Sequence, residues 1–196
     1  MQRLPPAPWS PLSLMFGRLF RRDREAIAIA TAVYGAIVAQ ARMPALYTDF
    51  AVADTVTGRF EMVVLHLSLV LDRLFGGDRE AQALGQAVFD LYCKDMDRSL
   101  RELGFGDLGV PHRMKKMAQA YYGRAAAYRR AVAATDEADL VATLRRNVYA
   151  GGGEGVAPAL AAYVRTSAAT LAAEPLAEIR AARLVFAPLP AAEAAA

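Results

Sequence analysis

Cysteine is almost absent from this chain of 196 residues, since Cys93 is the only one. A single cysteine excludes an internal disulfide and a zinc cluster built from cysteines. Cys93 lies between apolar neighbours, which indicates a buried, unreactive thiol. The longest apolar run, residues 26–39, is shorter than the roughly 20 residues that cross a bilayer as a helix. We therefore expect no disulfide, no metal site and no transmembrane segment.

Arrangements typical of catalysis are also missing. His66 lies within an apolar segment, where a hydrogen-bonded core histidine is the usual structure, and no serine occupies a nucleophile elbow. Gly104, Gly106 and Gly109 match the spacing of a dinucleotide-binding loop, but a charged helix instead of a strand precedes them. Together with Asp107, these glycines predict a turn between two helices. We expect a protein that is not an enzyme and that holds no cofactor.

Sustained alternation of apolar and polar residues is missing too, so the sequence predicts no strands. The expected class is all-α, with a single compact domain of about six to seven helices over residues 23–186. Residues 62–71 are apolar nearly all round, which predicts a central helix. Capping residues and glycines place the helices at 23–41, 55–75, 78–103, 111–134, 136–149, 157–172 and 174–184. Residues 187–196 are expected to form a disordered tail.

Positive charge is concentrated at the N-terminus, where five arginines and two acidic residues in 1–25 account for the formal charge of +3. Within the proline-rich, basic arm formed by residues 1–22, residues 12–22 place apolar side chains on one side of a helix. This pattern is typical of a weak membrane-surface contact. A short helix folded back on the core is the alternative, and we favour it over the membrane contact, with Asp23 capping the next helix. The neutral remainder predicts no DNA partner. Without a recognisable secretory signal or transmembrane segment, we expect a cytoplasmic protein, peripheral at the inner face of the cytoplasmic membrane if the arm contacts lipid.

The segment 95–128 is the most distinctive part of the chain. Its first half is a charged helix in which Asp97 with Arg101, and Arg98 with Glu102, are spaced to form ion pairs. Its second half is a helix with an apolar face and with basic residues that have no acidic residue among them: Arg113, Lys115, Lys116, Arg124, Arg129 and Arg130. Such a helix is either solvated or a docking surface for RNA, phosphate or an acidic protein.

Three segments, in this order, resemble the ubiquinol–cytochrome c chaperone family: YGAIVAQARMP at 34–44, DTVTGRFEMVVLHLSLVLDRL at 54–74, and residues 89–128 with DMDRSLRELGFGDL and KKMAQAYYGRAAAY. The resemblance implies a non-enzymatic assembly factor for the cytochrome bc1 complex that holds newly made cytochrome b. In mitochondria such proteins also engage ribosomes and a small partner. The loop LGVPH at 108–112 departs from the family pattern, and no mitochondrial targeting extension is present, which indicates a bacterial member.

The family motif falls on particular residues of this chain: Asp95, Asp97, Arg101, Glu102, Gly104, Gly106, Asp107, Lys115, Gly123 and Arg124. A chaperone needs an exposed groove for its client. We expect this groove beside the helices at 78–103 and 111–134, with partner contacts from Asp95, Asp97, Arg101, Glu102, Arg113, Lys115, Lys116, Tyr122 and Arg124. The alternative function is a helical RNA-binding or regulatory module that uses the same basic helix.

Overall fold

The computed structural model describes residues 11–102 and 110–189, with side chains from residues 24–102 and 117–189. Helices make up the ordered elements, and the described residues contain no strand, which confirms the all-α class. Six longer helices are accompanied by two of five residues each, α2 and α8. Their bounds are α1 Pro11–Ala41, α2 Pro44–Thr48, α3 Val56–Phe75, α4 Arg79–Glu102, α5 Val110–Ala133, α6 Glu137–Asn147, α7 Ala157–Ala173 and α8 Leu176–Arg180.

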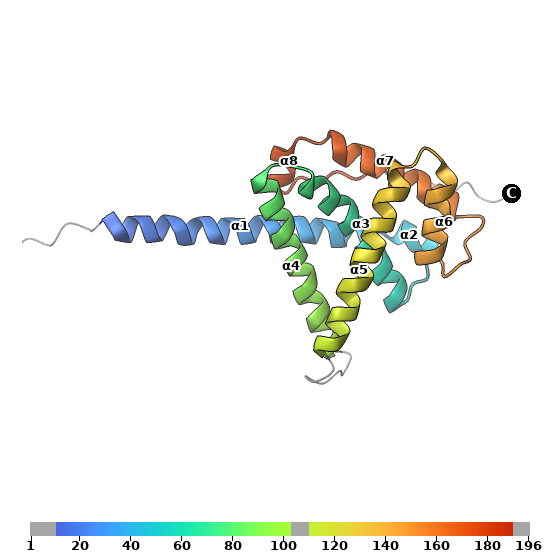
Figure 1. Cartoon of the computed structure of the whole chain (residues 1–196), viewed down its shortest axis with the longest axis horizontal. Helices are drawn as coiled ribbons and strands as arrows, with labels where there is room; N and C mark the ends of the chain where they lie inside the picture. Colours follow the sequence, from blue (N-terminus) through green and yellow to red (C-terminus); the bar gives the residue numbers. More distant parts are fainter. Residues whose placement is uncertain (1–10, 103–109, 190–196) are drawn as a thin grey trace, which may run out of the picture.

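Helix α3 is the centre of the molecule, as its apolar sequence predicts. Every residue from Glu61 to Leu71 on this helix is buried. Helices α1, α4, α5 and α7 all pack against it, and α6 joins α5 to α7 (Figure 1). Helices α4 and α5 converge toward the connection between them, so that they form a V on one side of α3 (Figure 1). Because α3 is buried on several sides, the helices that cover it are arranged around it.

Side-chain caps begin the helices where the sequence places them. Thr55 Oγ1 accepts a hydrogen bond from the Gly58 N–H at 3.1 Å at the start of α3. Asp78 accepts from Ala81 N–H at 2.9 Å before α4, and Asp136 accepts from Ala138 N–H at 2.8 Å before α6. Each cap satisfies a backbone donor that has no partner inside the helix.

The prediction of a helix start at Asp23 is wrong. One helix, α1, runs for 31 residues from Pro11 to Ala41, and its N-terminal part extends away from the body instead of folding back (Figure 1). The arginines at 18, 21 and 22 favour a helix. An aspartate marks a start only where the preceding chain leaves the helical conformation, and Pro11 suits the first turn of the observed helix.

The C-terminal end also differs from the prediction. Helix α8 ends at Arg180, and Ala182 has a φ of 57°, a left-handed conformation that turns the chain away. The chain then remains packed: Ala187 is buried, and its N–H donates to Ser167 Oγ at 3.2 Å. Packing therefore extends past the expected start of the tail at residue 187. Residues 190–196 of the expected tail lie outside the described residues.

One stretch of the chain, Arg24–Thr48, is long and apolar enough to cross a membrane by length and composition alone, with a mean hydropathy of 1.4. Val33, Ile37 and Ala41 in this stretch are buried in the core that α1 shares with α3 and α4. Only 22% of the apolar window is buried inside the structure, so the expectation of no transmembrane segment stays a prediction.

Two glycines in helices allow a matched stability test. A Cβ added at Gly58 would overlap the carbonyl oxygen of Ala53, so the backbone must shift. We expect Gly58→Ala to lower the free energy of unfolding by about 2 kcal/mol. A Cβ at Gly35 in α1 meets nothing within 4 Å, and Gly35→Ala is expected to raise it by about 0.5–1 kcal/mol. Urea denaturation measures both, and a Gly58→Ala variant as stable as the original protein or more stable would contradict the close approach at Gly58.

Candidate functional site

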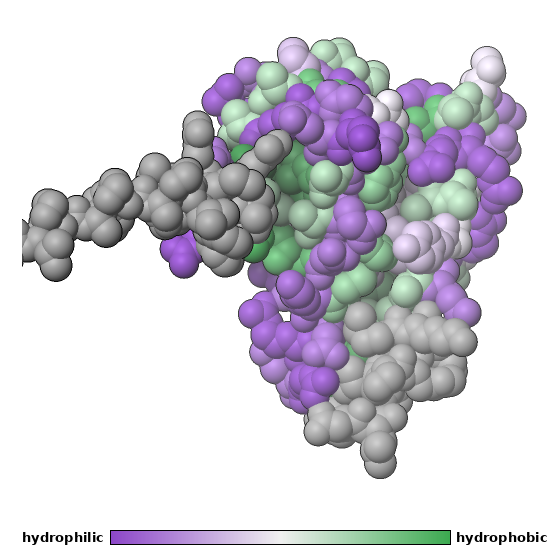
Figure 2. Space-filling model, turned by 60° about the vertical axis from the view of Figure 1, so that its left-hand side comes forward, coloured by the Kyte–Doolittle hydropathy of each residue, from purple (hydrophilic) through white to green (hydrophobic). Residues whose placement is uncertain are grey.

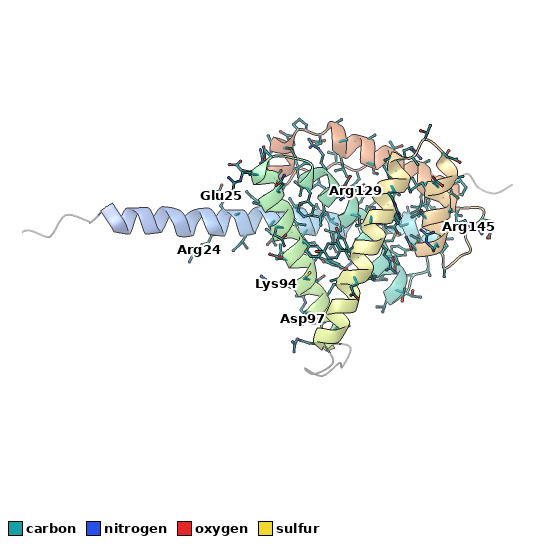
Figure 3. The ribbon with its side chains drawn as sticks, viewed as in Figure 1. Arg24, Glu25, Lys94, Asp97, Arg129 and Arg145 are labelled. Carbon is teal, nitrogen blue, oxygen red and sulfur yellow. The ribbon has the colours of Figure 1, made fainter. Side chains whose placement is uncertain are left out.

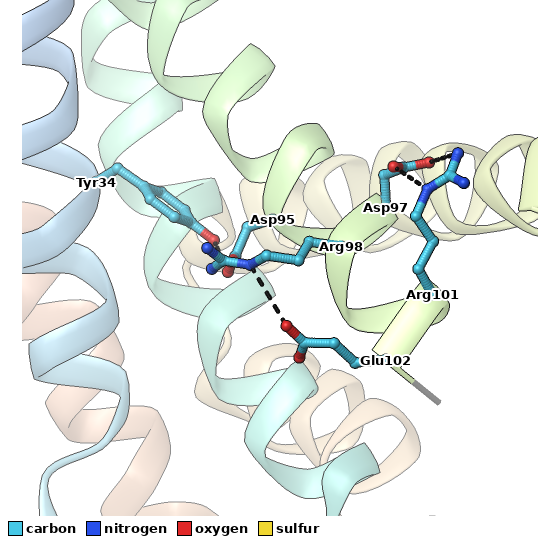
Figure 4. Close-up of polar contacts among 6 residues, drawn as sticks. All are labelled: Tyr34, Asp95, Asp97, Arg98, Arg101 and Glu102. Atoms are coloured by element: carbon cyan, nitrogen blue, oxygen red, sulfur yellow. Dashed lines mark hydrogen bonds and ion pairs between the residues drawn. The ribbon is translucent and has the colours of Figure 1, made fainter. Parts of the chain in front are cut away.

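The charged residues of α4 form two separate groups (Figure 4). Arg101 Nε donates to Asp97 at 2.8 Å, and Arg98 lies 4.0 Å from Glu102, which confirms both predicted ion pairs. All four side chains are more than a third exposed, so each pair contributes at most a few tenths of a kcal/mol. These contacts lie along the surface of α4.

Asp95 faces a different direction and joins α4 to α1. It accepts a hydrogen bond from the Tyr34 hydroxyl at 2.9 Å and pairs with Arg98 (Figure 4). Burial raises the pKa of Tyr34, and the negative charge of Asp95 raises it further, so the phenol stays protonated. Asp95 therefore holds two helices together in addition to lining the surface between them.

Arg124 of α5 is paired with an acidic residue that sequence reasoning missed, Glu61 of α3. Its Nε and Nη2 atoms each donate to one carboxylate oxygen of Glu61, both at 2.6 Å. The Glu61 side chain is 3% exposed and that of Arg124 is 27% exposed. A bidentate pair of this kind fixes the relative position of two helices as well as joining their charges.

Burial and pairing act on the Glu61 carboxyl in opposite directions. Burial raises its pKa, and the hydrogen bonds and charge of Arg124 offset only part of that rise. Burial is the largest influence on the pKa of Arg124 and lowers it, but the hydrogen bonds and the charge of Glu61, with smaller contributions from Tyr128 and Tyr92, together raise it above its usual value. Glu61 is thus a desolvated carboxyl whose ionised form depends on a single cation.

A second basic residue of α5 also has an acidic partner that the sequence does not reveal. Arg129 pairs with Asp72 of α3, so α3 supplies acids for two of the six basic residues. The side chains of Arg113, Lys115 and Lys116 lie outside the described residues, as does the whole turn with Gly104, Gly106 and Asp107. Figure 3 shows Lys94, Asp97, Arg129 and Arg145 on three different helices, α4, α5 and α6. Among the described side chains, these charges therefore lie on three helices and not on one.

Tyr121 and Tyr122, neighbours in sequence, have different surroundings. Tyr121 is 4% exposed and packs on Tyr92 and Phe89 with ring centroids 5.7 and 5.0 Å away, as expected for a core tyrosine. Tyr122 is 61% exposed, and its ring lies 5.7 Å from Phe89 on the surface. Cys93 of α4 is half-buried, and burial raises the pKa of its thiol, which favours the unreactive form.

A pocket of about 570 Å³ opens between α1, α3, α4 and α5. It lies beside the two helices where the groove is expected, and its size is typical of ligand pockets. Asp95 and Arg124 from the predicted set line it, whereas Asp97, Arg101, Glu102 and Tyr122 do not. Most of the lining is apolar and includes Val38, Phe60, Val63, Met96, Leu100 and Met117.

A smaller hollow of about 370 Å³ lies between α1, α4 and α8, lined by Ala26, Ile29, Leu84 and Ala87. Figure 2 shows apolar surface where α1 leaves the body, bordered by hydrophilic residues. Arg24 and Glu25 lie at the same place (Figure 3). None of the predicted partner-binding residues lines this hollow, so the larger pocket is the better candidate site.

His66 is the hydrogen-bonded core histidine that the sequence predicts, and it belongs to neither hollow. Its Nδ1 lies 2.7 Å from the Met62 carbonyl oxygen, which can only accept, so Nδ1 carries the proton. Its Nε2 then accepts from the Tyr163 hydroxyl at 2.8 Å. Among the described side chains, no group of three or more His, Cys, Asp or Glu residues is arranged to hold a metal ion.

Comparisons with known proteins identify the family. A family model described as "Ubiquinol-cytochrome C chaperone" matches residues 48–186, which include the second and third resembling segments. A crystal structure of the Cbp3 homolog from Brucella abortus is 41% identical, with a TM-score of 0.80, and the match covers 89% of this chain and 97% of that one. No curated protein sequence matches. The chain belongs to the ubiquinol–cytochrome c chaperone family.

Proposed function

We propose that this protein is a non-enzymatic assembly chaperone for the cytochrome bc1 complex and that it binds newly made cytochrome b in the pocket between α1, α3, α4 and α5. Membership of the family supports the role in bc1 assembly. The observation that carries the binding site is the apolar pocket of about 570 Å³ beside Asp95 and Arg124. Client segments of a membrane protein are apolar, and an exposed apolar groove shields them from water.

The walls of the pocket suit a changing set of client side chains. Met96 and Met117 lie on opposite helices, α4 and α5, and methionine side chains adapt their shape to the group they contact. Asp95 and Glu61 hold these helices to α1 and α3 through Tyr34 and Arg124. The helices around the pocket are therefore held in place, while the methionine side chains that would contact the client can change their shape.

Filling the pocket tests this proposal. Ser99 lines the pocket from α4, and we expect Ser99→Trp to lower recovery of cytochrome b at least tenfold, because the indole occupies the space of the client. Lys94→Trp, on an exposed position of the same helix that does not line the pocket, is the matched control. The measurement is a tagged pull-down from mildly solubilised membranes, read by mass spectrometry. Unchanged recovery with Ser99→Trp, in a variant of unchanged stability, would overturn the pocket assignment.

Arg124 is a poor position for a docking test. Arg124→Glu places a second carboxylate against buried Glu61, so a loss of bc1 assembly would report a damaged fold. The same pairing weakens the rival function. An RNA-binding face needs cations that are free to meet phosphates, and Arg124 and Arg129 both have acidic partners on α3. Salt-dependent retention of RNA, with bc1 assembly intact after deletion of the protein, would favour the rival.

The ribosome and the membrane surface remain proposed partners. The N-terminal part of α1, with residues 12–22, extends from the body and is available for either contact (Figure 1). We propose a cytoplasmic location with peripheral contact at the inner face of the membrane, where newly made cytochrome b is inserted. Recovery of the protein in the soluble fraction after deletion of residues 1–22, and at the membrane before it, would support this location.

A further inference from the structure

The charged groups around the pocket between α1, α3, α4 and α5 are paired, with one exception. Arg59 donates to Asp54 at 2.6 and 3.1 Å, Arg124 is held by Glu61, and Asp95 is held by Arg98 and Tyr34. Arg42 lines the same pocket and has no hydrogen-bond or ion-pair partner for its side chain among the described residues. Among the described side chains that line the pocket, Arg42 is therefore the one cation without a paired acid, and it lies beside an apolar surface.

The position of Arg42 is fixed by the end of α1. Its backbone N–H donates to the Val38 carbonyl at 3.1 Å, directly after the last residue of the helix. The side chain is exposed, and its positive charge lowers the pKa values of the Tyr34 and Tyr47 phenols, which burial raises by more, so both phenols stay neutral. The negative end of the α1 dipole favours a cation here but leaves the five guanidinium donors unused.

Helices form all four walls of the pocket, and the described residues offer no strand edge that an extended peptide could join. A helical segment that places apolar side chains three and four residues apart into a groove is the recognition mode that fits such walls. A positively charged segment would be repelled by Arg42, whereas a carboxylate next to the apolar side chains would pair with it.

We propose that the pocket binds an apolar helical segment that carries a carboxylate and that Arg42 pairs with that carboxylate. This inference rests on the proposed function of the pocket and adds the chemical class of the client segment. Arg42 sets the direction in which the segment lies, because the carboxylate must reach the end of α1. The apolar side chains of the segment then contact the methionines at 96 and 117.

Two synthetic leucine- and alanine-rich helical peptides test the charge preference. They differ at one flanking position, which is aspartate in one and lysine in the other. Fluorescence anisotropy with the full chain at low salt is expected to give about three- to fivefold tighter binding of the aspartate peptide, the range of a partly exposed ion pair. Arg42→Glu should reverse the preference, Arg42→Lys should retain it, and high salt should remove it. Arg146→Glu, an exposed arginine of α6 outside this pocket, makes the same charge change and should leave the preference unchanged.

The outcomes separate the charge preference from the pocket itself. Equal binding of both peptides, abolished by Ser99→Trp, would overturn the role of Arg42 and leave the pocket as the client site. Binding that Ser99→Trp does not affect would overturn the pocket assignment and the proposal with it. Binding of neither peptide, or Arg42-dependent binding of free dodecanoate without any difference between the peptides, would also overturn the proposal.

Discussion

Replacing Arg124 by methionine is expected to lower the free energy of unfolding by about 3 kcal/mol. The substitution keeps an apolar stem but removes both hydrogen bonds to Glu61, whose carboxylate is 3% exposed and has no other ion-pair partner among the described residues. Leaving one charge of a buried pair unpaired costs about 3–5 kcal/mol. The lower end applies because the Arg124 side chain is 27% exposed, and solvent screens part of the effect.

A double variant distinguishes the loss of the pair from the cost of the buried charge. Replacing Glu61 as well, in Glu61→Met with Arg124→Met, removes the carboxylate and is expected to restore most of the lost stability. Guanidinium denaturation of the four proteins gives the coupling between the two residues. If the double variant is less stable than Arg124→Met alone, the ion pair itself stabilises the fold, contrary to this expectation.

The Arg124→Met defect should also depend on pH. The folded-state pKa of Glu61 is already above its usual value of 4.5, and loss of Arg124 removes the interactions that lower it. An acid whose pKa is higher in the folded than in the unfolded protein does not lower stability below its unfolded pKa. It destabilises the folded protein as pH rises through its folded pKa. The unfolding free energy of the variant should therefore approach that of the wild type near pH 4.5. The difference between the two should be largest above pH 7.

Acidification is expected to destabilise the wild-type protein through His66. This side chain is completely buried, and burial lowers its pKa from 6.5 to about 4. A depressed histidine pKa contributes stability that is complete above the unfolded pKa and is lost as pH falls toward the folded pKa. The free energy of unfolding should therefore fall between pH 6.5 and pH 4. The full loss is about 3 kcal/mol, at 1.36 kcal/mol for each unit by which the pKa is lowered.

Comparison with a variant isolates this contribution from the carboxylates that titrate in the same range. His66→Gln has no group that titrates here, so its unfolding free energy should fall less than that of the wild type between pH 7 and pH 4.5. Parallel pH profiles of the wild type and His66→Gln would contradict a neutral, buried imidazole.

Local rules in the sequence predicted most of the helices because a cap requires only neighbouring residues. Thr55, Asp78 and Asp136 each satisfy an N–H two or three residues further along, so the starts of α3, α4 and α6 are correct. Asp23 failed as a start signal because the preceding residues continue the helix. The sequence around Asp23 is compatible with a new helix that begins there and with one continuous helix, and only the structure distinguishes them.

The candidate site was predicted less completely, since it depends on partners distant in sequence. Arg124 and Glu61 are 63 residues apart, and Asp95 and Tyr34 are 61 apart. Sequence spacing predicted Arg124 beside a groove, and Arg124 lines the pocket, but the spacing gave no sign that an acid from α3 would neutralise it. A lone glutamate at the start of the apolar run in α3 was the available signal, because buried carboxylates require a cation.

The continuous helix α1 has a mechanical consequence. From Pro11 to Arg24 it rises about 20 Å at 1.5 Å per residue, and the same rod continues to Val38 in the pocket wall and ends beside Arg42. A helix without a break transmits rotation and tension along its axis, whereas a hinge at residue 23 would absorb them. Whatever binds the outer end of α1 would therefore set the distance and the orientation at which the pocket faces the proposed client.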